Sequence, residues 1–416
     1  MGRSSLTIAA VVLMGIGAMT TVSRVAASGI PPDCGTDKAP YSFAVLAEGF
    51  TASEQGFFAA VSHQMVCGLA FEKEPLFKSH PGAFAATSVP LVSTTSATAA
   101  TPDTALQITY TGSRHDDCFF KTGPDTLQRI VNGADQASDH QQVLVMVNIG
   151  DQEAGCTDGD AVFLTRGSRW QILAHEIGHV LSLKDEYTDL PGVSTETLNH
   201  SNCSLSPAWW ATLKGAAYLK GCARYDNFFH AFDACRMHSE EDVFCNVCRQ
   251  LIEEALPPPA QDPVPSVLLS IRLSHSDDAK GVGAGGVEVL GAKDVVSQAP
   301  RAPQVRKDAY LAVVLVGDSV AAIADESRFF ADSQLIRRAY GSGAVHDVSA
   351  AREALIILHV PRFTSAQLRN RNPEFRLIRV MTADPPGIMS AAFLRSDGVQ
   401  TLFQANPLTL PQAPGR

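Results

Sequence analysis

The chain has 416 residues, of which 45% are hydrophobic and 18% are charged. This composition is typical of a folded globular protein and excludes a disordered or fibrous chain, and the length suggests two or three domains. All nine cysteines lie between Cys34 and Cys248, and none follows in the rest of the chain. We therefore expect two regions that are stabilised in different ways.

The first 27 residues have the features of a signal peptide. Arg3 precedes a short apolar segment at residues 6–19, and residues 25–27 (Val-Ala-Ala) occupy the positions that a signal peptidase reads, so we place cleavage after Ala27. The alternative is an uncleaved N-terminal anchor, although the apolar segment is too short to span a membrane comfortably. We therefore expect a secreted protein, periplasmic or extracellular, with no membrane span after signal removal, in a compartment where disulfides persist.

Charge is distributed unevenly along the chain, whose formal net charge is −10. Residues 28–265 carry 14 Lys/Arg against 29 Asp/Glu, whereas residues 266–416 carry 17 against 14. A strongly acidic exported region argues against nucleic acid or an anionic membrane as the main partner. It is compatible with a bound divalent cation.

The proline-rich segment 256–265 (LPPPAQDPVP) is the clearest boundary in the chain. Proline disrupts both the interior of a helix and the ladder of a sheet, so this segment predicts a stiff, extended linker. The last cysteine and the change in charge balance fall at the same place. The expected order is a signal peptide (1–27), an acidic region with an N-terminal lobe (28–255), the linker (256–265) and a C-terminal domain (266–416).

Strand and helix patterns alternate upstream of the linker. Apolar runs predict short buried strands at 43–46, 143–149 and 161–165. Two capping boxes, Thr51 with Glu54 and Ser168 with Gln171, predict the starts of helices, the first of which runs to about Leu69. Helical spacing predicts a further helix over 127–134. The region upstream of the linker is therefore expected to be α/β (α+β).

The pattern changes downstream of the linker. Runs of β-branched and apolar residues, separated by Gly, Pro and Asp, lie at 267–273, 310–316, 355–360 and 375–381. They predict a mainly β accessory domain, for which a β-sandwich is one arrangement.

Residues 175–179 read His-Glu-Ile-Gly-His, an HExxH motif on the helix expected after Ser168. Residues four apart lie one above the other on a helix, so His175 and His179 can present imidazole nitrogens to one zinc ion. The carboxylate of Glu176 lies one position round the helix, where it can take a proton from water and return it to a leaving amine. The motif predicts a Zn2+ site with Glu176 as catalytic base, and the alternative is a helix with two histidines and no metal.

A third protein ligand is expected shortly after this helix. Asp185 lies six residues after His179, the offset at which metzincin-type peptidases place their third ligand. We therefore choose Asp185, with Glu186 as the alternative, and both acids could instead lie on the surface. Metzincins turn the chain at a glycine, and this chain has Ser182 there. Met237 is either a methionine beneath the metal, as in metzincins, or a packing residue.

Five segments together resemble the IgA peptidase family of zinc metallopeptidases. They are FAVLAEGFTASEQGFF (43–58), PDTAL (102–106), VLVMVN (143–148), HEIGHVLSLKDEY (175–187) and CRMHSEEDVFCNVC (235–248). The resemblance covers roughly residues 41–250 and implies a zincin-like catalytic region in a secreted zinc endopeptidase. It also implies that His175 and His179 bind the metal and that Glu176 is the base. The segment between His179 and Asp185 is a residue shorter than in the family and lacks its usual glycines, and we do not transfer the family's immunoglobulin substrate.

Cysteine spacing near the end of the acidic region allows two interpretations. Cys235, His238, Cys245 and Cys248 form a C-x2-H-x6-C-x2-C pattern that could bind a structural zinc ion. Exported cysteines are more often paired, so we expect disulfides at these cysteines instead. Because nine is an odd number, at least one cysteine is free or is paired outside the chain.

These observations predict a secreted zinc endopeptidase that acts on a protein or peptide substrate. Two other classes stay open: a secreted binding or adhesion protein with an inactive zincin scaffold, and a zinc-dependent amidase acting on cell-wall peptides. The intact Glu176 argues against an inactive scaffold. Cleavage preference, disulfide connectivity, propeptide processing and oligomeric state are not defined by the sequence.

Overall fold

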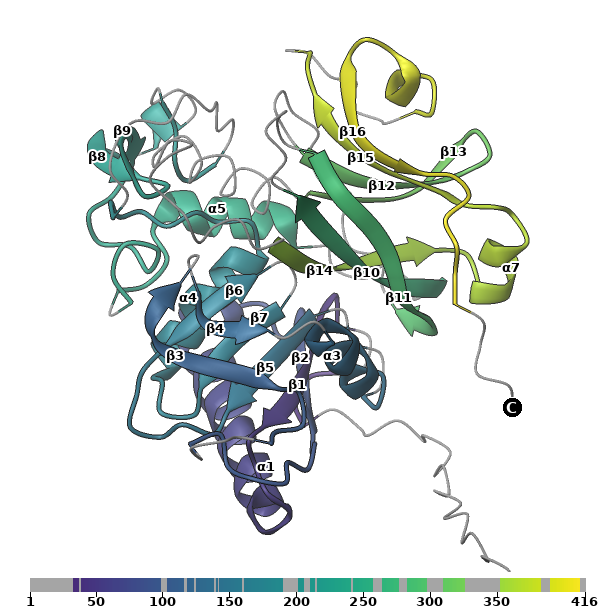
Figure 1. The fold of residues 1–416 in the computed structure, drawn as a ribbon. Helices are drawn as coiled ribbons and strands as arrows, with labels where there is room; N and C mark the ends of the chain where they lie inside the picture. Colours follow the sequence, from purple (N-terminus) through teal and green to yellow (C-terminus); the bar gives the residue numbers. More distant parts are fainter. Residues whose placement is uncertain are drawn as a thin grey trace, which may run out of the picture.

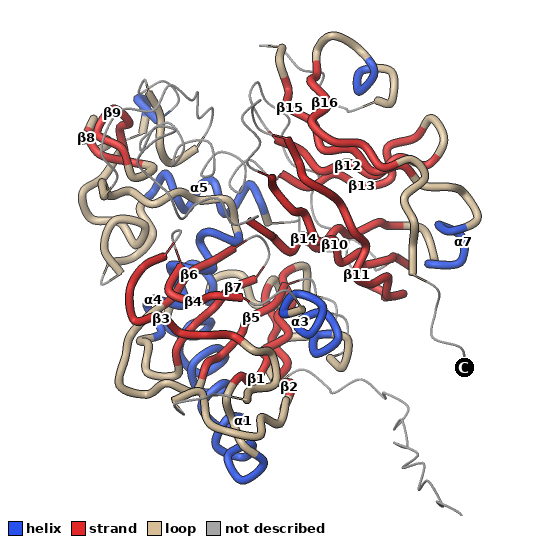
Figure 2. The backbone as a smooth tube through the Cα atoms, viewed as in Figure 1, coloured by secondary structure: helices blue, strands red, loops and turns tan. Residues whose placement is uncertain are grey.

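The computed structural model describes residues 33–411, apart from residues 37–38, 99–102, 116–117, 123–124, 138–139, 141, 159–160, 190–200, 206–209, 214, 241, 257–263, 277–282, 298–309, 326–351 and 383–389. The expected signal peptide and most of the proline-rich segment therefore lie outside the described residues. The structure is a mixed α/β protein with several sheets and few helices (Figure 2).

A five-stranded sheet forms the centre of the region before the linker (Figure 1). Its order is β2 (Phe84–Val89), β1 (Tyr41–Glu48), β5 (Gln142–Val147), β7 (Ala161–Thr165) and β6 (Gly155–Asp158). Four strands run parallel, and only the edge strand β6 is antiparallel to its neighbour. The strands predicted at 43–46, 143–149 and 161–165 are confirmed.

Both faces of this sheet are buried, which explains why its strands are continuous apolar runs. On one face, Phe43 and Val45 pack with α1 (Gln55–His63), the π-helix η2 (Gln64–Phe71) and α4 (Trp170–Val180). On the other face, Ala44 and Leu46 pack with α3 (Thr126–Ala134). Helix α4 therefore packs against a sheet that is covered on both faces.

The two predicted capping boxes have different outcomes. Glu54 accepts a hydrogen bond from the backbone N–H of Thr51 at 2.8 Å, so the first box is confirmed. The second is wrong, because α4 begins after Arg169 and no side chain caps it. The Ser168 hydroxyl instead donates to the carbonyl of Ala154 at 2.9 Å, which joins the start of α4 to the strand connection before it.

Three disulfides join parts of this region, between Cys34 and Cys67, Cys118 and Cys156, and Cys203 and Cys222. The second joins β4 (Cys118–Thr122), which pairs with β3 (Ile108–His115), to the edge strand β6. The third lies beside the hairpin of β8 (Leu219–Cys222) and β9 (Tyr225–His230). Such cross-links typically stabilise a fold by about 2–4 kcal/mol each and persist in oxidising compartments.

No helix in the described part of the chain is both long enough and apolar enough to cross a membrane.

From Val264 onward the chain forms two antiparallel sheets, which contain the four predicted strand runs except for Met381 at the end of the last run. Val264 and Pro265, predicted as the end of the linker, already belong to the first of these strands. The first sheet contains β11 (Gly283–Ser297), β10 (Val264–Ser276) and β14 (Arg352–Pro361). The second contains β13 (Ser319–Asp325), β12 (Tyr310–Val316), β15 (Glu374–Val380) and β16 (Val399–Ala405). Side chains from both sheets share one apolar core, for example Leu269, Val314 and Leu377.

The three-stranded sheet also packs against the region before the linker. Leu268 of β10 and Ile357 of β14 belong to the same apolar cluster as Val131 of α3. At the edge of this contact, the ammonium group of Lys293 donates to the carbonyl of Ala137 at 2.6 Å. The two parts of the chain therefore share a core in addition to the covalent connection between them.

One buried histidine makes the C-terminal sheets sensitive to acid. His359 lies on β14 opposite Leu268, and burial lowers the pKa of its imidazole from 6.5 to about 4. As the pH falls from about 6.5 to about 4, the imidazole of His359 binds a proton in the unfolded chain but not in the folded chain. The free energy of unfolding therefore decreases across this pH range.

We expect the wild type to lose about 2 kcal/mol of unfolding free energy between pH 7 and pH 5 that a His359→Gln variant does not lose. Urea unfolding at both pH values measures this difference. Equal pH dependence in the two proteins would show that His359 takes up its proton without unfolding.

Candidate metal centre

Helix α4 carries the three residues of the HExxH motif. It follows β7 and runs from Trp170 to Val180, with His175 and His179 one turn apart and their ring centroids 4.8 Å from each other. His175 and Glu176 are buried, and His179 keeps some exposure. The helix thus presents both imidazoles on the same face, as the spacing predicts.

A tight turn after α4 brings Asp185 back toward these imidazoles. The turn is made by Ser182, whose φ of 68° lies in the left-handed region that favours glycine. A serine there costs about 1 kcal/mol relative to glycine, and the exposed position of Ser182 leaves its side chain free of steric conflict. The chain therefore turns back after α4 without a glycine.

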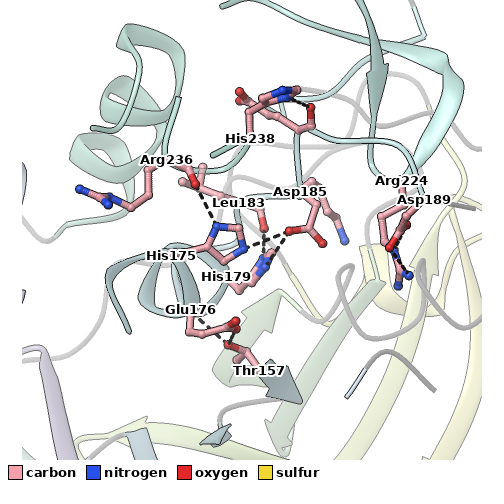
Figure 3. Close-up of polar contacts among 12 residues, drawn as sticks. Thr157, His175, Glu176, His179, Leu183, Asp185, Asp189, Arg224, Arg236 and His238 are labelled. Atoms are coloured by element: carbon pink, nitrogen blue, oxygen red, sulfur yellow. Dashed lines mark hydrogen bonds and ion pairs between the residues drawn. The ribbon is translucent and has the colours of Figure 1, made fainter. Parts of the chain in front are cut away.

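Asp185 meets both histidines at one point (Figure 3). Its Oδ1 lies 3.1 Å from Nε2 of His175 and 3.2 Å from Nε2 of His179. Glu186, the alternative third ligand, faces away from this point and is fully buried beside three cysteines. The structure therefore brings together His175, His179 and Asp185 as one donor set, and excludes Glu186 from it.

Two backbone carbonyls fix the orientation of the imidazoles. Nδ1 of His175 donates to the carbonyl of Arg236 at 2.9 Å, and Nδ1 of His179 donates to the carbonyl of Leu183 at 3.0 Å. Each ring therefore presents Nε2 to Asp185, and this nitrogen carries a lone pair when the imidazole is neutral. Such outer partners are typical of histidines that bind metals.

The three donor atoms fit a metal ion. Two lone pairs and a carboxylate oxygen repel one another at this distance unless a cation lies among them. Zinc bonds of about 2.0–2.1 Å in tetrahedral geometry separate nitrogen and oxygen ligands by about 3.3 Å, which is close to the separations from Asp185 to the two histidines.

Protons can also supply the positive charge that this donor set requires. Burial alone would lower the pKa of His175, but the hydrogen bond from His175 to Asp185 and the negative charges of Asp185 and Glu176 outweigh burial and raise it to about 9. Burial would raise the pKa of Asp185, yet the charges and hydrogen bonds of the two histidines hold it well below its usual range. The three side chains therefore strongly favour a bound positive charge.

Glu176 is held beside this donor set by the edge strand. Its Oε2 accepts a hydrogen bond from the hydroxyl of Thr157 on β6 at 2.6 Å (Figure 3). Gly155 on the same strand makes room for Glu176, because a Cβ there would lie 3.2 Å from Oε1 of Glu176 and 2.6 Å from Ile172. Nothing in the sequence pattern identified Thr157 or Gly155, since their role depends on how β6 pairs.

The segment that orients His175 is anchored by a buried ion pair. The guanidinium of Arg236 lies 2.7 Å from the carboxylate of Glu74, and both side chains are 1% exposed. Burial raises the pKa of Glu74 although Arg236 faces it, so the pair is maintained against a desolvation cost. Arg236 also stacks over Trp170 at 5.1 Å. Nothing in the sequence singled out Glu74, because this residue lies far from every motif in the chain.

Met237 packs directly beneath α4. A Cβ on Gly178 would lie 2.7 Å from Sδ of Met237, so the glycine of the HExxH motif permits this contact. Met237 is fully buried, and its carbonyl accepts the backbone N–H of Glu186 at 2.7 Å. The residue therefore packs below the histidines and also supports the turn that carries Asp185.

The disulfides predicted at Cys235, Cys245 and Cys248 are wrong. All three are free and buried, and Sγ of Cys235 lies 3.5 Å from Sγ of Cys248. Their ligand atoms cluster with the carboxylate of Glu186. His238, which the spacing offers as a ligand, instead contacts the carbonyl of Glu186 through Nδ1 at 2.6 Å. The prediction failed because it weighed the compartment alone and could not see the buried acid beside the thiols.

Comparison with known proteins adds no assignment: no protein-family model and no curated protein sequence matches this chain. The resemblance to the IgA peptidase family therefore rests on the sequence segments themselves.

The Glu74–Arg236 pair provides a test of how the donor set is supported. We expect Arg236→Met to lower the free energy of unfolding by about 3–5 kcal/mol, because it leaves a buried carboxylate without its partner. Chemical denaturation measures this loss.

The matched control is Arg224→Met, which removes a more exposed pair with Asp189 and should cost less than about 1 kcal/mol. Adding Glu74→Gln to Arg236→Met should restore part of the stability. A similar loss for both single variants would contradict the argument.

Proposed function

We propose that the chain is a secreted zinc-dependent endopeptidase that resembles the IgA peptidase family. The observation that carries the proposal is the meeting of His175, His179 and Asp185 at one point beside the carboxylate of Glu176. This is the residue set that hydrolytic zinc sites use: three protein ligands and a neighbouring general base.

The chemistry divides between the ion and the chain. Zinc held by the three ligands would polarise a scissile carbonyl and lower the pKa of a water molecule. The carboxylate of Glu176 would take a proton from the attacking water and later deliver it to the leaving amine. The hydroxyl of Thr157 holds the Glu176 carboxylate in one orientation, and the carbonyls of Arg236 and Leu183 hold the imidazoles.

A peptide substrate is supported by the position of β6. This strand is the edge of the five-stranded sheet, and its residue Thr157 contacts Glu176 directly. An extended peptide can add to a sheet edge through backbone hydrogen bonds, and binding along β6 would bring its carbonyls near the donor set. The same reasoning favours a chain substrate over a small amide.

The proposal includes the fold of the catalytic region and that of the C-terminal domain. A five-stranded sheet with an antiparallel edge strand and the motif helix packed against it supports a zincin-like catalytic region. Two antiparallel sheets that share a core support a β-sandwich accessory domain. The three disulfides support an oxidising compartment and therefore export.

The first test removes the base and leaves the ligands in place. We expect Glu176→Gln to reduce peptide hydrolysis by about 10²–10⁴-fold, because the proton acceptor is lost, with unchanged zinc content. Digestion of a peptide library read by mass spectrometry measures activity, and elemental analysis measures zinc.

Glu153→Gln is the matched control, since Glu153 is an exposed acid paired with Arg169, and it should cleave as the wild type does. If wild type and Glu176→Gln bind zinc equally and neither cleaves any peptide, the enzyme proposal fails in favour of a binding protein. Cleavage of cell-wall peptides alone would indicate an amidase.

The second test concerns the third ligand. We expect Asp185→Asn to lose about one zinc ion per chain and nearly all activity, because a neutral amide replaces the only carboxylate in the donor set. Asp189→Asn, four residues on and exposed, should retain both. Full zinc content in Asp185→Asn would remove Asp185 from the site.

A further inference from the structure

A second group of potential ligands lies in the core, apart from the histidines. Cys235, Cys245, Cys248 and Glu186 are all buried, and one ligand atom from each lies within 4.8 Å of all the others. These three cysteines are the ones that the disulfides leave over. In their ionised forms these four groups can stay buried only if a positive charge compensates them.

The distances suit a shared ion better than a covalent bond. Sγ of Cys235 and Sγ of Cys248 are 3.5 Å apart, well beyond the length of about 2.0 Å of a disulfide bond. Tetrahedral zinc with sulfur at about 2.3 Å separates two thiolates by about 3.8 Å. Oε1 of Glu186 lies 3.2 Å from Sγ of Cys248, which is also near the edge of such a tetrahedron.

Only one of the two carboxylate oxygens of Glu186 has a hydrogen-bond partner among the described residues. Asn202, itself fully buried, donates from Nδ2 to Oε1 of Glu186 at 3.0 Å and to the carbonyl of Lys184 at 2.7 Å. Oε2 of Glu186 is buried without a hydrogen-bond partner among the described residues. A buried carboxylate oxygen left in this way is costly unless a cation binds to the group.

Helix α5 (Asn246–Ala255) adds favourable electrostatics. Cys245 is its N-cap residue and Cys248 lies in its first turn. The positive end of the helix dipole stabilises thiolates, which are the form of cysteine that binds metals.

We propose that Cys235, Cys245, Cys248 and Glu186 bind a structural zinc ion, separate from the ion held by the histidines. Three thiolates and a carboxylate form a soft, four-coordinate, closed set, as structural zinc sites have. The proposal accounts for the odd cysteine count, because six cysteines form disulfides and the remaining three are ligands.

This ion also fixes the histidine site through the backbone. Glu186 follows Asp185 in the chain, and Cys235 precedes Arg236, whose carbonyl orients His175. The backbone N–H of Glu186 donates to the carbonyl of Met237 at 2.7 Å, which joins the two segments between the sites. Only this positioning role depends on the proposed peptidase function; the ion-binding role does not.

The test uses the full chain with its disulfides formed, purified without chelators and loaded with zinc alone. We expect about two zinc ions per chain in the wild type and about one in a His175→Ala/His179→Ala double variant. X-ray absorption at the zinc edge of the double variant should show sulfur neighbours at about 2.3 Å. Alkylation after denaturation without reductant should modify three cysteines.

Each outcome separates the two proposals. One zinc ion with sulfur ligands in both proteins supports the structural site and sinks the peptidase proposal. One ion in the wild type and none in the double variant overturns the structural site and leaves the peptidase proposal intact. A fourth disulfide, with a single alkylated cysteine, also overturns the structural site.

A ligand variant gives an independent measurement. Glu186→Gln keeps the shape of the side chain and the contact to Asn202 but replaces the anionic ligand. We expect it to lose the sulfur-bound zinc to a chelator at least about tenfold faster than the wild type. Equal loss rates in the two proteins would show that Glu186 is not a ligand.

Discussion

Two adjacent carboxylates that face opposite ways set the geometry of the centre of this protein. Asp185 meets the histidines of α4, and Glu186 meets the three free cysteines. Cys235 and Arg236, which are also adjacent in the chain, are divided between the two sites in the same way. Cys235 belongs to the cysteine cluster, and the carbonyl of Arg236 orients His175. Neither site can shift without moving the backbone of the other, so the two donor sets constrain each other.

The layers of the fold supply the rigidity that such a division requires. The five-stranded sheet is buried on both faces, with α4 on one and α3 on the other, and the three-stranded C-terminal sheet packs on the α3 side. Close packing makes interiors of this kind resistant to small displacements. The three-stranded C-terminal sheet therefore helps to cover the central sheet on the face opposite α4.

The sequence was sufficient to predict features that depend on local periodicity. It did not predict contacts between residues that are distant in the chain. The spacing of His175 and His179 was sufficient to place both imidazoles on one helix face. The offset from His179 favoured Asp185, but the separation of Asp185 from Glu186 depends on the φ of Ser182 and on the hydrogen bond from Asn202, which no local pattern contains. The capping box expected at Ser168 failed for the same reason, because its hydroxyl donates to the carbonyl of Ala154, in the connection just before β6.

The disulfide between Cys118 and Cys156 has a consequence for where the protein can work. It fastens the edge strand that presents Thr157 to a separate hairpin. Under reducing conditions this disulfide would be open, and the strand that aligns Glu176 would have one fewer constraint. The redox state of the surroundings therefore bears on how firmly the carboxylate of Glu176 is held beside the histidines.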